Sequence, residues 1–449
     1  MYNLKIKNLV KHFNQPLLEG INLTHSGKGI IAVIGDNGSG KSTLLKVIVG
    51  LEEQDSGEII WDTPPAIGYL TQEITDYETL SGGEKKLAKL AELLYSGQYD
   101  VVLLDEPDNH LDLDNKIWLE EALADYDGLV IMISHDRAFL SNVSTKVWLL
   151  ENHQIKTYPF GYTKFKQIYE EEELAKADLY KTQLKEKKRL EVMALMFRDK
   201  GFIGAYHNTQ KRLERLKTEM VENPLAKKAS ITIQTRLENK IIKKKTAIII
   251  KDLVFGYDGE KLFDSANLHL FVQDKVALLS PNGTGKSTLI NLLLGKLEPQ
   301  SGEAKIGPNL KVGYYSQEHS ATLPLEETPL SIFASRHSLF DYEIEAILKK
   351  FFFTKQTMRS KIWTLSGGQR SRLQLALFLY TNPDLLILDE PTNHLDLKSV
   401  MSLEIFLKEF EGTVLLISHD RELVKNVADR VYTIANHRLI ETHQTDELK

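Results

Sequence analysis

The chain contains one series of short motifs twice, in the same order. Five motifs recur: GDNGSGKST at 35–43 as SPNGTGKST at 280–288, YLTQE at 69–73 as YYSQE at 314–318, LSGGE at 80–84 as LSGGQ at 365–369, LLDEP at 103–107 as ILDEP at 387–391, and ISHDR at 133–137 and again at 417–421. Repetition of this kind indicates two copies of one structural unit, a strong restriction on the folds open to 449 residues.

The two copies differ in length at one place. Lys286 follows Lys41 by 245 positions, whereas Ser366 follows Ser81 by 285 positions. About 40 residues are therefore missing from the first copy, where only 73–79 connect Gln72 to the LSGG motif. In the second copy this stretch includes 325–361, whose apolar spacing predicts a small helical subdomain.

Short apolar runs lead into the motifs of both copies. Continuous apolar stretches with β-branched residues are typical of buried parallel strands, which we predict at 30–34, 101–104, 129–133, 276–279, 385–388 and 414–417. Helices are predicted at 42–49 and 287–294. The fold class is therefore α/β, with one unit at 1–160, a second at 247–449, and a different segment between them.

The segment 161–246 is predicted to be a basic helical hairpin. It carries 21 Lys and Arg against 12 Asp and Glu, a net +9, which leaves 35 against 50 in the rest of the chain. Residues 163–197 contain no Gly or Pro, and Gly201 and Gly204 mark a turn before a helix at 206–221. A weak coiled-coil seam can be traced with seven-residue spacing: Phe165, Tyr169, Leu179, Leu190, Met193 and Phe197, with Leu213, Leu216 and Met220 opposite.

Composition excludes several classes of protein. Cysteine is absent, which excludes disulfides, thiol nucleophiles, iron-sulfur clusters and thiolate zinc sites. The longest apolar runs fall far short of the roughly 18 residues that a membrane-spanning helix needs. The N-terminal ten residues alternate like a strand and lack the apolar core of a signal peptide. We therefore expect a cytoplasmic protein without a membrane domain.

The first repeated motif has the pattern of a loop that binds ATP. Glycines let backbone N–H groups wrap around phosphates, a lysine reaches the terminal phosphates, and a hydroxyl holds Mg²⁺. The predicted ATP-binding residues are Gly35, Asn37, Gly38, Gly40, Lys41, Ser42 and Thr43, with Asn282, Gly283, Gly285, Lys286, Ser287 and Thr288. Ser280 replaces the first glycine, and because serine does not freely adopt positive φ, we expect a less favourable second loop.

Other repeated residues complete two predicted sites for ATP and Mg²⁺. Asp105 and Asp389 end predicted strands where they can order Mg²⁺, and the next residues, Glu106 and Glu390, can polarise an attacking water. The amides of Gln72 and Gln317 are further candidate metal ligands, beside Ser42 and Ser287. His135 and His419 are predicted to sense the γ-phosphate and hold the glutamates.

The LSGG motifs predict a second anion site on each copy. Each serine and its glycines would close on the nucleotide held by the other copy, which gives an intramolecular sandwich; the residues are Ser81, Gly82 and Gly83, and Ser366, Gly367 and Gly368. Phe13 and Tyr257 precede the phosphate loops and are candidates to stack on adenine, with packing in the core as the alternative.

This set of motifs resembles the ATP-binding cassette superfamily, and two cassettes joined by a basic hairpin resemble its ABC-F family. The resemblance rests on the NHLD sequences at 109–112 and 393–396, the SHDR sequences, and FGYT at 160–163. It implies a monomeric ATPase that binds the ribosome, with the hairpin reaching toward the tRNA and the peptidyl-transferase region. Candidate rRNA and tRNA contacts at the turn are Arg198, Lys200, Phe202, Tyr206, Lys211 and Arg212.

The resemblance leaves three alternatives open. The deletion in the first copy resembles antibiotic-resistance members, whereas translation factors of the family typically carry an extra arm at that point. Two features depart from the resistance members: the linker is shorter than many of them carry, and Asp108 replaces the usual threonine of EPTN. An ATPase subunit of a membrane transporter would use the same cassettes, although the first copy lacks most of the docking subdomain. A DNA-repair ATPase would usually carry a longer coil or cysteine-based zinc elements.

Overall fold

The structure is a computed structural model, and it describes residues 2–13, 16–71, 82–109, 111–219, 245–257, 259–315, 323–336, 339–351, 353–365, 367–381, 383–392, 395 and 397–442. The chain divides into two compact units. One combines Met1–Tyr162 with Ser230–Lys449 and holds both repeats, and the other is Thr163–Ala229.

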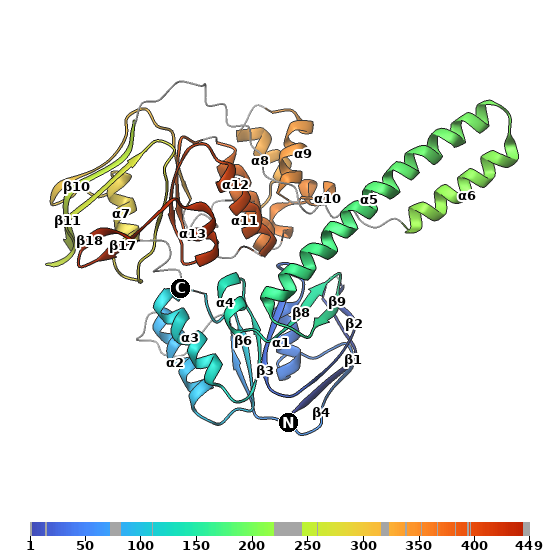
Figure 1. The fold of residues 1–449 in the computed structure, drawn as a ribbon, viewed down its shortest axis with the longest axis horizontal. Helices are drawn as coiled ribbons and strands as arrows, with labels where there is room; N and C mark the ends of the chain where they lie inside the picture. Colours follow the sequence, from blue (N-terminus) through green and yellow to red (C-terminus); the bar gives the residue numbers. More distant parts are fainter. Residues whose placement is uncertain are drawn as a thin grey trace. The chain divides into compact units, whose positions relative to one another are not determined.

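The first cassette has two sheets (Figure 1). The smaller is antiparallel, in the order β2-β1-β4, with β1 Asn3–His12, β2 Pro16–Ser26 and β4 Ser56–Trp61. The larger has the order β5-β6-β7-β3-β8-β9, and all its neighbours are parallel except β8 and β9. Its strands are β3 Gly29–Gly35, β5 Ile67–Leu70, β6 Val101–Asp105, β7 Leu129–Ile133, β8 Lys146–Glu151 and β9 Gln154–Tyr158.

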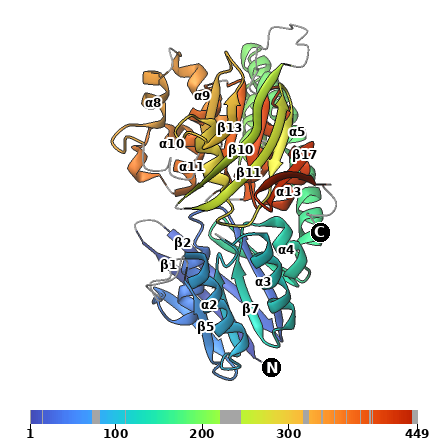
Figure 2. The same cartoon turned by 90° about the vertical axis from the view of Figure 1, so that its left-hand side faces the viewer.

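The second cassette repeats this topology. Its smaller sheet has the order β11-β10-β13, with β10 Thr246–Tyr257, β11 Glu260–Phe271 and β13 Ser301–Ile306 (Figure 2). The larger has the order β14-β15-β16-β12-β17-β18, with β12 Lys275–Leu278, β14 Val312–Tyr315, β15 Leu385–Asp389, β16 Thr413–Ile417, β17 Arg430–Ala435 and β18 Arg438–Thr442. The predicted α/β fold class is confirmed, and each predicted strand is present.

Helices cover the large sheets of both cassettes. In the first they are α1 Lys41–Val49, α2 Gly82–Tyr95, α3 Leu113–Asp125 and α4 Arg137–Val143. In the second they are α7 Lys286–Leu293, α11 Gly367–Leu379, α12 Leu397–Glu409 and α13 Arg421–Val427. The strands in the middle of each sheet are fully buried because apolar side chains lie on both of their faces, as the continuous apolar runs predict.

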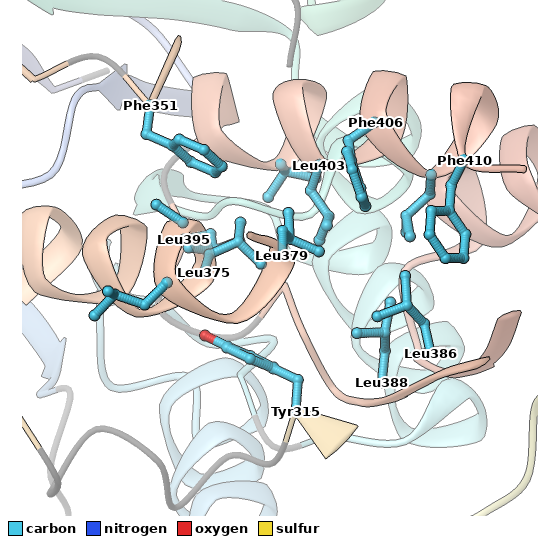
Figure 3. Close-up of a cluster of buried hydrophobic side chains, with 14 of the residues drawn as sticks. Tyr315, Phe351, Leu375, Leu379, Leu386, Leu388, Leu395, Leu403, Phe406 and Phe410 are labelled. Carbon is cyan, nitrogen blue, oxygen red and sulfur yellow. The ribbon is translucent and has the colours of Figure 1, made fainter. Parts of the chain in front are cut away.

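The predicted helical subdomain of the second cassette is confirmed. It consists of α8 Pro329–Arg336, α9 Asp341–Lys350, α10 Lys355–Arg359 and a 3₁₀ turn at Ile362–Thr364. Phe351 joins this subdomain to a core with Tyr315, Leu375 and Phe406 (Figure 3). The corresponding connection in the first copy, 73–79, lies outside the described residues.

The hairpin consists of α5 Tyr162–Asp199 and α6 Ile203–Glu219, antiparallel to each other (Figure 1). Gly201, at φ 74°, ends α5, with the Phe202 amide donating to the Phe197 carbonyl at 2.9 Å and the two rings 6.4 Å apart. This is a Schellman turn with its usual hydrophobic contact. Gly204 was predicted to belong to the turn but lies inside α6.

The seam between the hairpin helices follows the sequence prediction in part. Leu190 and Leu213 are buried, as predicted, together with Ala194 and Thr209. Leu179 is 48% exposed, so its place in the seam is wrong. Gln183 on α5 donates to the carbonyl of Glu219, the last described residue of α6, so Leu179 lies beyond the described part of its partner helix. Met220 lies outside the described residues.

Candidate functional site

The two phosphate loops join a buried strand to a helix in each cassette. The first loop connects β3 to α1, and the second connects β12 to α7. Gly40 and Gly285 are the residues before the helices, at φ 105° and 100°, and Gly38 and Gly283 lie at 79° and 81°. These conformations favour glycine, and they leave the N–H groups of the loop and helix start directed at one position.

Each loop lysine lies over its own loop. Lys41 Nζ donates to the carbonyls of Gly35 and Asp36 at 2.8 and 3.1 Å. Lys286 Nζ donates to the carbonyl of Ser280 at 2.6 Å and lies 3.1 Å from His419 Nε2. Burial lowers the pKa of Lys286, although Glu390 and Asp112 oppose this effect. Both amines therefore lie where a terminal phosphate would bind.

The hydroxyl and carboxylate predicted to hold Mg²⁺ lie together in the first cassette. Ser42 Oγ donates to Asp105 Oδ1 at 3.1 Å, from the start of α1 to the end of β6. Burial raises the pKa of Asp105, and Ser42 and Lys41 oppose the shift. Oxygen atoms of this type suit Mg²⁺, which takes few protein ligands beside phosphate and water. A bound Mg²⁺ would neutralise charge on the phosphates. Asp389 ends β15 in the same way.

The predicted catalytic glutamates share a rare backbone conformation. Glu106 and Glu390 have φ values of 52° and 48°, and their amides donate to Ile133 and Ile417 at 3.0 and 2.9 Å. Left-handed backbone in a residue other than glycine costs energy and occurs often at active sites. These backbone bonds to the neighbouring strand fix the position of each glutamate at the carboxyl end of the parallel strands, beside the phosphate loop.

The two histidines face these glutamates. His135 Nε2 lies 3.8 Å from Glu106 Oε1, and His419 Nε2 lies 3.5 Å from Glu390 Oε1. The pKa of Glu390 is raised to about 7, chiefly by burial, against the opposing effects of Lys116 and Lys286. Burial, followed by Lys286 and Lys116, lowers the pKa of His419 to about 3. A neutral imidazole and a carboxylate that titrates near neutrality suit activation of water.

Ser280 fits its loop for a reason that the sequence did not reveal. The expected difficulty, positive φ, does not arise, because neither Gly35 nor Ser280 is among the positive-φ residues of the described chain. The Ser280 hydroxyl accepts a hydrogen bond from the Ile434 amide at 2.6 Å. At Gly35, in contrast, a Cβ would lie 2.5 Å from the Leu150 carbonyl oxygen. The glycine is therefore required by close packing in the first copy only.

The remaining predicted site residues are placed in part. Thr43 and Thr288 lie in the first turns of α1 and α7. Phe13 and Tyr257 are 60% and 50% exposed, so core packing, the alternative, is wrong for both rings. Gly82 and Gly367 begin α2 and α11, followed by Gly83 and Gly368. Gln72, Gln317, Ser81 and Ser366 lie outside the described residues.

The two cassettes contact each other beside these sites. Asp112, just before α3, accepts from the Asn282 amide in the second phosphate loop at 3.1 Å. Arg137 pairs with Glu404 at 2.7 Å across the contact, and Arg421 pairs with Glu120. Because these residues are counterparts at an offset of 284, the two pairs form one contact made twice.

Sequence reasoning missed two lysines of the first cassette. Lys86 Nζ donates to the carbonyls of Glu106 and Asn109 at 2.7 and 3.0 Å. Lys116 Nζ lies 2.7 Å from Asp136 and 3.4 Å from the His419 carbonyl of the other cassette. The signal was available in the repeat itself, because the counterparts of these lysines are Ser371 and Val400.

Together, the repeated loop, the strand-end carboxylates and the contact between the copies define an ATPase with two ATP-binding cassettes. The family described as "ABC transporter" matches residues 18–75 and 263–393. The "Ribosome protection protein VmlR" of Bacillus subtilis (strain 168) is 31% identical over 481 residues, covering 97% of this chain and 85% of the relative. The "ABC transporter F family member 2" of Arabidopsis thaliana is 29% identical, covering 92% and 73%.

The chain belongs to the ABC-F family, and it hydrolyses ATP. Among solved structures, the archaeal ribosome recycling factor aABCE1, in complex with the stalk protein aP1, matches with a TM-score of 0.65 at 16% identity, over 96% of this chain and 89% of that one. At this identity the likeness concerns the fold. Within the described residues, each helix is too short or too polar to cross a membrane.

Proposed function

We propose that this ATPase binds the ribosome, and therefore works in the cytoplasm, and that its hairpin acts near the tRNA and the peptidyl-transferase region to protect the large subunit from antibiotics. The relative named a ribosome protection protein supports this role, because it matches 97% of the chain, hairpin included. The partners would be rRNA and tRNA, bound by one copy of the chain whose own two cassettes form the ATP-dependent pair.

Binding and hydrolysis of ATP at the two sites would close and open the cassettes, and so control binding to the ribosome. Lys41 and Lys286 would bind the terminal phosphates, and Ser42 with Asp105, and Ser287 with Asp389, would hold Mg²⁺. Glu106 and Glu390 would polarise the attacking water, and His135 and His419 would hold these glutamates in place. Hydrolysis would then release the contacts between the cassettes and free the protein from its partner.

The observation that carries the proposal is the surface of the hairpin tip. Met196, Phe202 and Ile203 are 49%, 56% and 70% exposed at the end of the two helices, and Val192 and Leu195, one turn before it on α5, are 61% and 51% exposed. Apolar side chains exposed together mark a contact surface. Exposed basic residues, Arg198, Lys200, Lys211 and Arg212, flank this tip, with Tyr206 half-buried beside it. Basic flanks bind phosphates, and apolar or aromatic groups stack on unpaired bases.

Two hairpin variants test the proposal. Ribosome binding is measured in the Glu106→Gln/Glu390→Gln protein, which should bind ATP without hydrolysing it. The tip variant replaces Met196, Phe197, Phe202 and Ile203 by Ala. The flank variant replaces Lys211, Arg212 and Arg215 by Ala. Both variants are tested by cosedimentation with ribosomes at a series of salt concentrations. Antibiotic protection is measured by cell-free translation with large-subunit antibiotics, using the same variants in the protein that retains Glu106 and Glu390.

We expect the tip variant to bind ribosomes and hydrolyse ATP but to lose antibiotic protection. The flank variant should bind more weakly, with a smaller dependence on salt, because each lost phosphate contact removes counterion release. A tip variant that protects as well as wild type would remove the hairpin from the mechanism. ATP-dependent ribosome binding without protection would favour a translation factor, and cosedimentation with membranes alone would favour the transporter role.

A further inference from the structure

Three charged residues of the first cassette have uncharged counterparts in the second, and two of them, Asp108 and Lys116, lie at the contact between the cassettes. Lys86, Asp108 and Lys116 have the uncharged counterparts Ser371, Thr392 and Val400. All three are buried, with exposures of 4%, 4% and 7%. Burying a charge is costly unless it is paired. A set of buried charges confined to one of two copies therefore points to a task that the other copy does not share.

Lys116 is held on its own side by one carboxylate, that of Asp136. Its amine lies 2.7 Å from Asp136 Oδ2, and the two side chains are 9% and 5% exposed. Burial alone would lower the pKa of Lys116, but Asp136 and Asp108 outweigh it and raise the pKa. Asp136 in turn caps α4 by accepting from the Phe139 amide. Lys116 is therefore a cation with a fixed position.

The same amine reaches the second cassette. Lys116 Nζ lies 3.4 Å from the carbonyl oxygen of His419, the histidine whose ring faces Glu390 and Lys286. Lys116 lines a pocket with these three residues. At the related position of the other cassette, Val400 has no amine to donate to His135. The bond from one cassette to the histidine of the other is thus made at one ATP site.

We propose that Lys116, held by Asp136, is a positioning residue that acts from the first cassette on the second ATP site. It fixes the His419 backbone, and with it the ring that faces Glu390, only while the cassettes are in contact. Hydrolysis at the second site then depends on closure more strictly than hydrolysis at the first. The inference rests on the proposed catalytic roles of Glu390 and His419.

The test isolates each site with one glutamate substitution. In the Glu106→Gln protein only the second site hydrolyses ATP, and in the Glu390→Gln protein only the first. Asp108→Thr/Lys116→Val is added to each, which gives the first cassette the residues of the second. Asp136 keeps Arg421 as a neighbouring cation, as its counterpart Asp420 keeps Arg137. Thermal unfolding confirms that each protein folds, and steady-state ATPase gives kcat and KM.

We expect kcat of the second site to fall about tenfold more than kcat of the first, with KM for ATP changed little, because a hydrogen bond from a charged donor is lost. Lys116→Arg should retain more of the second-site rate than Lys116→Met, which keeps the chain length without the charge, and this single pair serves if the double substitution does not fold.

Equal losses of kcat at both sites would show that Lys116 only stabilises the contact, and would overturn the proposal. A Lys116→Met protein with the wild-type rate at the second site would also overturn it. The Glu106→Gln/Glu390→Gln protein separates these results from a failure of the catalytic assignment. If it hydrolyses ATP at the wild-type rate, the glutamate roles are wrong, and the inference falls with them.

Discussion

Replacing Arg137 by Ala should weaken the association of the two cassettes. Arg137 is 2% exposed, and its guanidinium lies 2.7 Å from Glu404 and 3.0 Å from Glu422, both in the other cassette. Removing one partner of a buried ion pair costs about 3–5 kcal/mol, because the other charge stays buried. Glu404 keeps Lys408 as a partner at 3.0 Å, which favours the lower end of this range.

A loss of about 3 kcal/mol corresponds to a closure equilibrium roughly a hundredfold less favourable, at about 1.4 kcal/mol per factor of ten. Because the chain has no cysteine, donor and acceptor dyes can be attached to single cysteines at Asp127 and Lys305, whose side chains are 88% and 69% exposed. Energy transfer against ATP concentration, in the Glu106→Gln/Glu390→Gln background, then measures closure without hydrolysis.

The control is the double variant Arg137→Met/Glu404→Gln, which removes both charges and should close more readily than Arg137→Ala. With the single variants Arg137→Met and Glu404→Gln it completes a double-mutant cycle, which separates the pair energy from other effects of each substitution. Arg421→Ala breaks the related pair with Glu120 and should behave like Arg137→Ala. If Arg137→Ala closes at the same ATP concentration as the parent protein, the ion pairs do not hold the cassettes together, and this reasoning is refuted.

Three smaller perturbations follow from the fold. Ser280→Ala should lower the free energy of unfolding by about 1–3 kcal/mol in urea unfolding, because it leaves the buried Ile434 amide without an acceptor. Gly35→Ser should prevent ATP binding at the first site, as measured by nucleotide titration. A Gly35→Ser protein that binds ATP normally would refute the packing argument. Gly201→Ala should destabilise the hairpin by about 1–2 kcal/mol through its positive φ alone, visible as faster amide exchange at the tip, and unchanged exchange would contradict the Schellman turn. Since the pKa of His419 is about 3 when folded and about 6.5 when unfolded, the unfolded chain binds the extra proton, and the contribution of His419 to stability should fall by about 1.6 kcal/mol from pH 6.5 to pH 5. Glu390, whose pKa is raised to about 7 on folding, acts in the opposite direction, so the comparison is made between the parent protein and a His419→Gln protein, which should lose the His419 part alone. An identical pH profile for the two proteins would show that His419 is not buried.

The sequence predicts local structure closely where one signal dominates. The strand predicted at 101–104 is β6 at Val101–Asp105, because a continuous apolar run has only one way to bury both faces in a parallel sheet. The helix predicted at 163–197 is α5 at Tyr162–Asp199, because no residue within it breaks a helix. The seam prediction fails at Leu179, which is 48% exposed, because heptad spacing alone does not determine which positions of a helix are buried.

Features of the sites that depend on distant partners could not be predicted. The acceptor role of Ser280 depends on Ile434, 154 positions away, and the reach of Lys116 depends on a backbone carbonyl 303 positions away. The left-handed conformation of Glu106 and Glu390 has no local sequence signal, because neither residue favours positive φ. What the repeat does reveal is where its copies differ, and two of those positions, Asp108 and Lys116, lie at the contact between the cassettes.

The most direct test of the proposed role is a crosslink from the hairpin tip to the ribosome. A photoreactive group on a single cysteine at Ile203, which is 70% exposed, is introduced into the Glu106→Gln/Glu390→Gln protein, with the same group at Asp127 as the matched control. We predict that ATP induces crosslinks from the tip position, but not from Asp127, to large-subunit rRNA of the peptidyl-transferase region or to tRNA. Tip crosslinks that do not depend on ATP, or that map to other parts of the ribosome, would contradict the proposal that closure of the cassettes delivers the hairpin to this region.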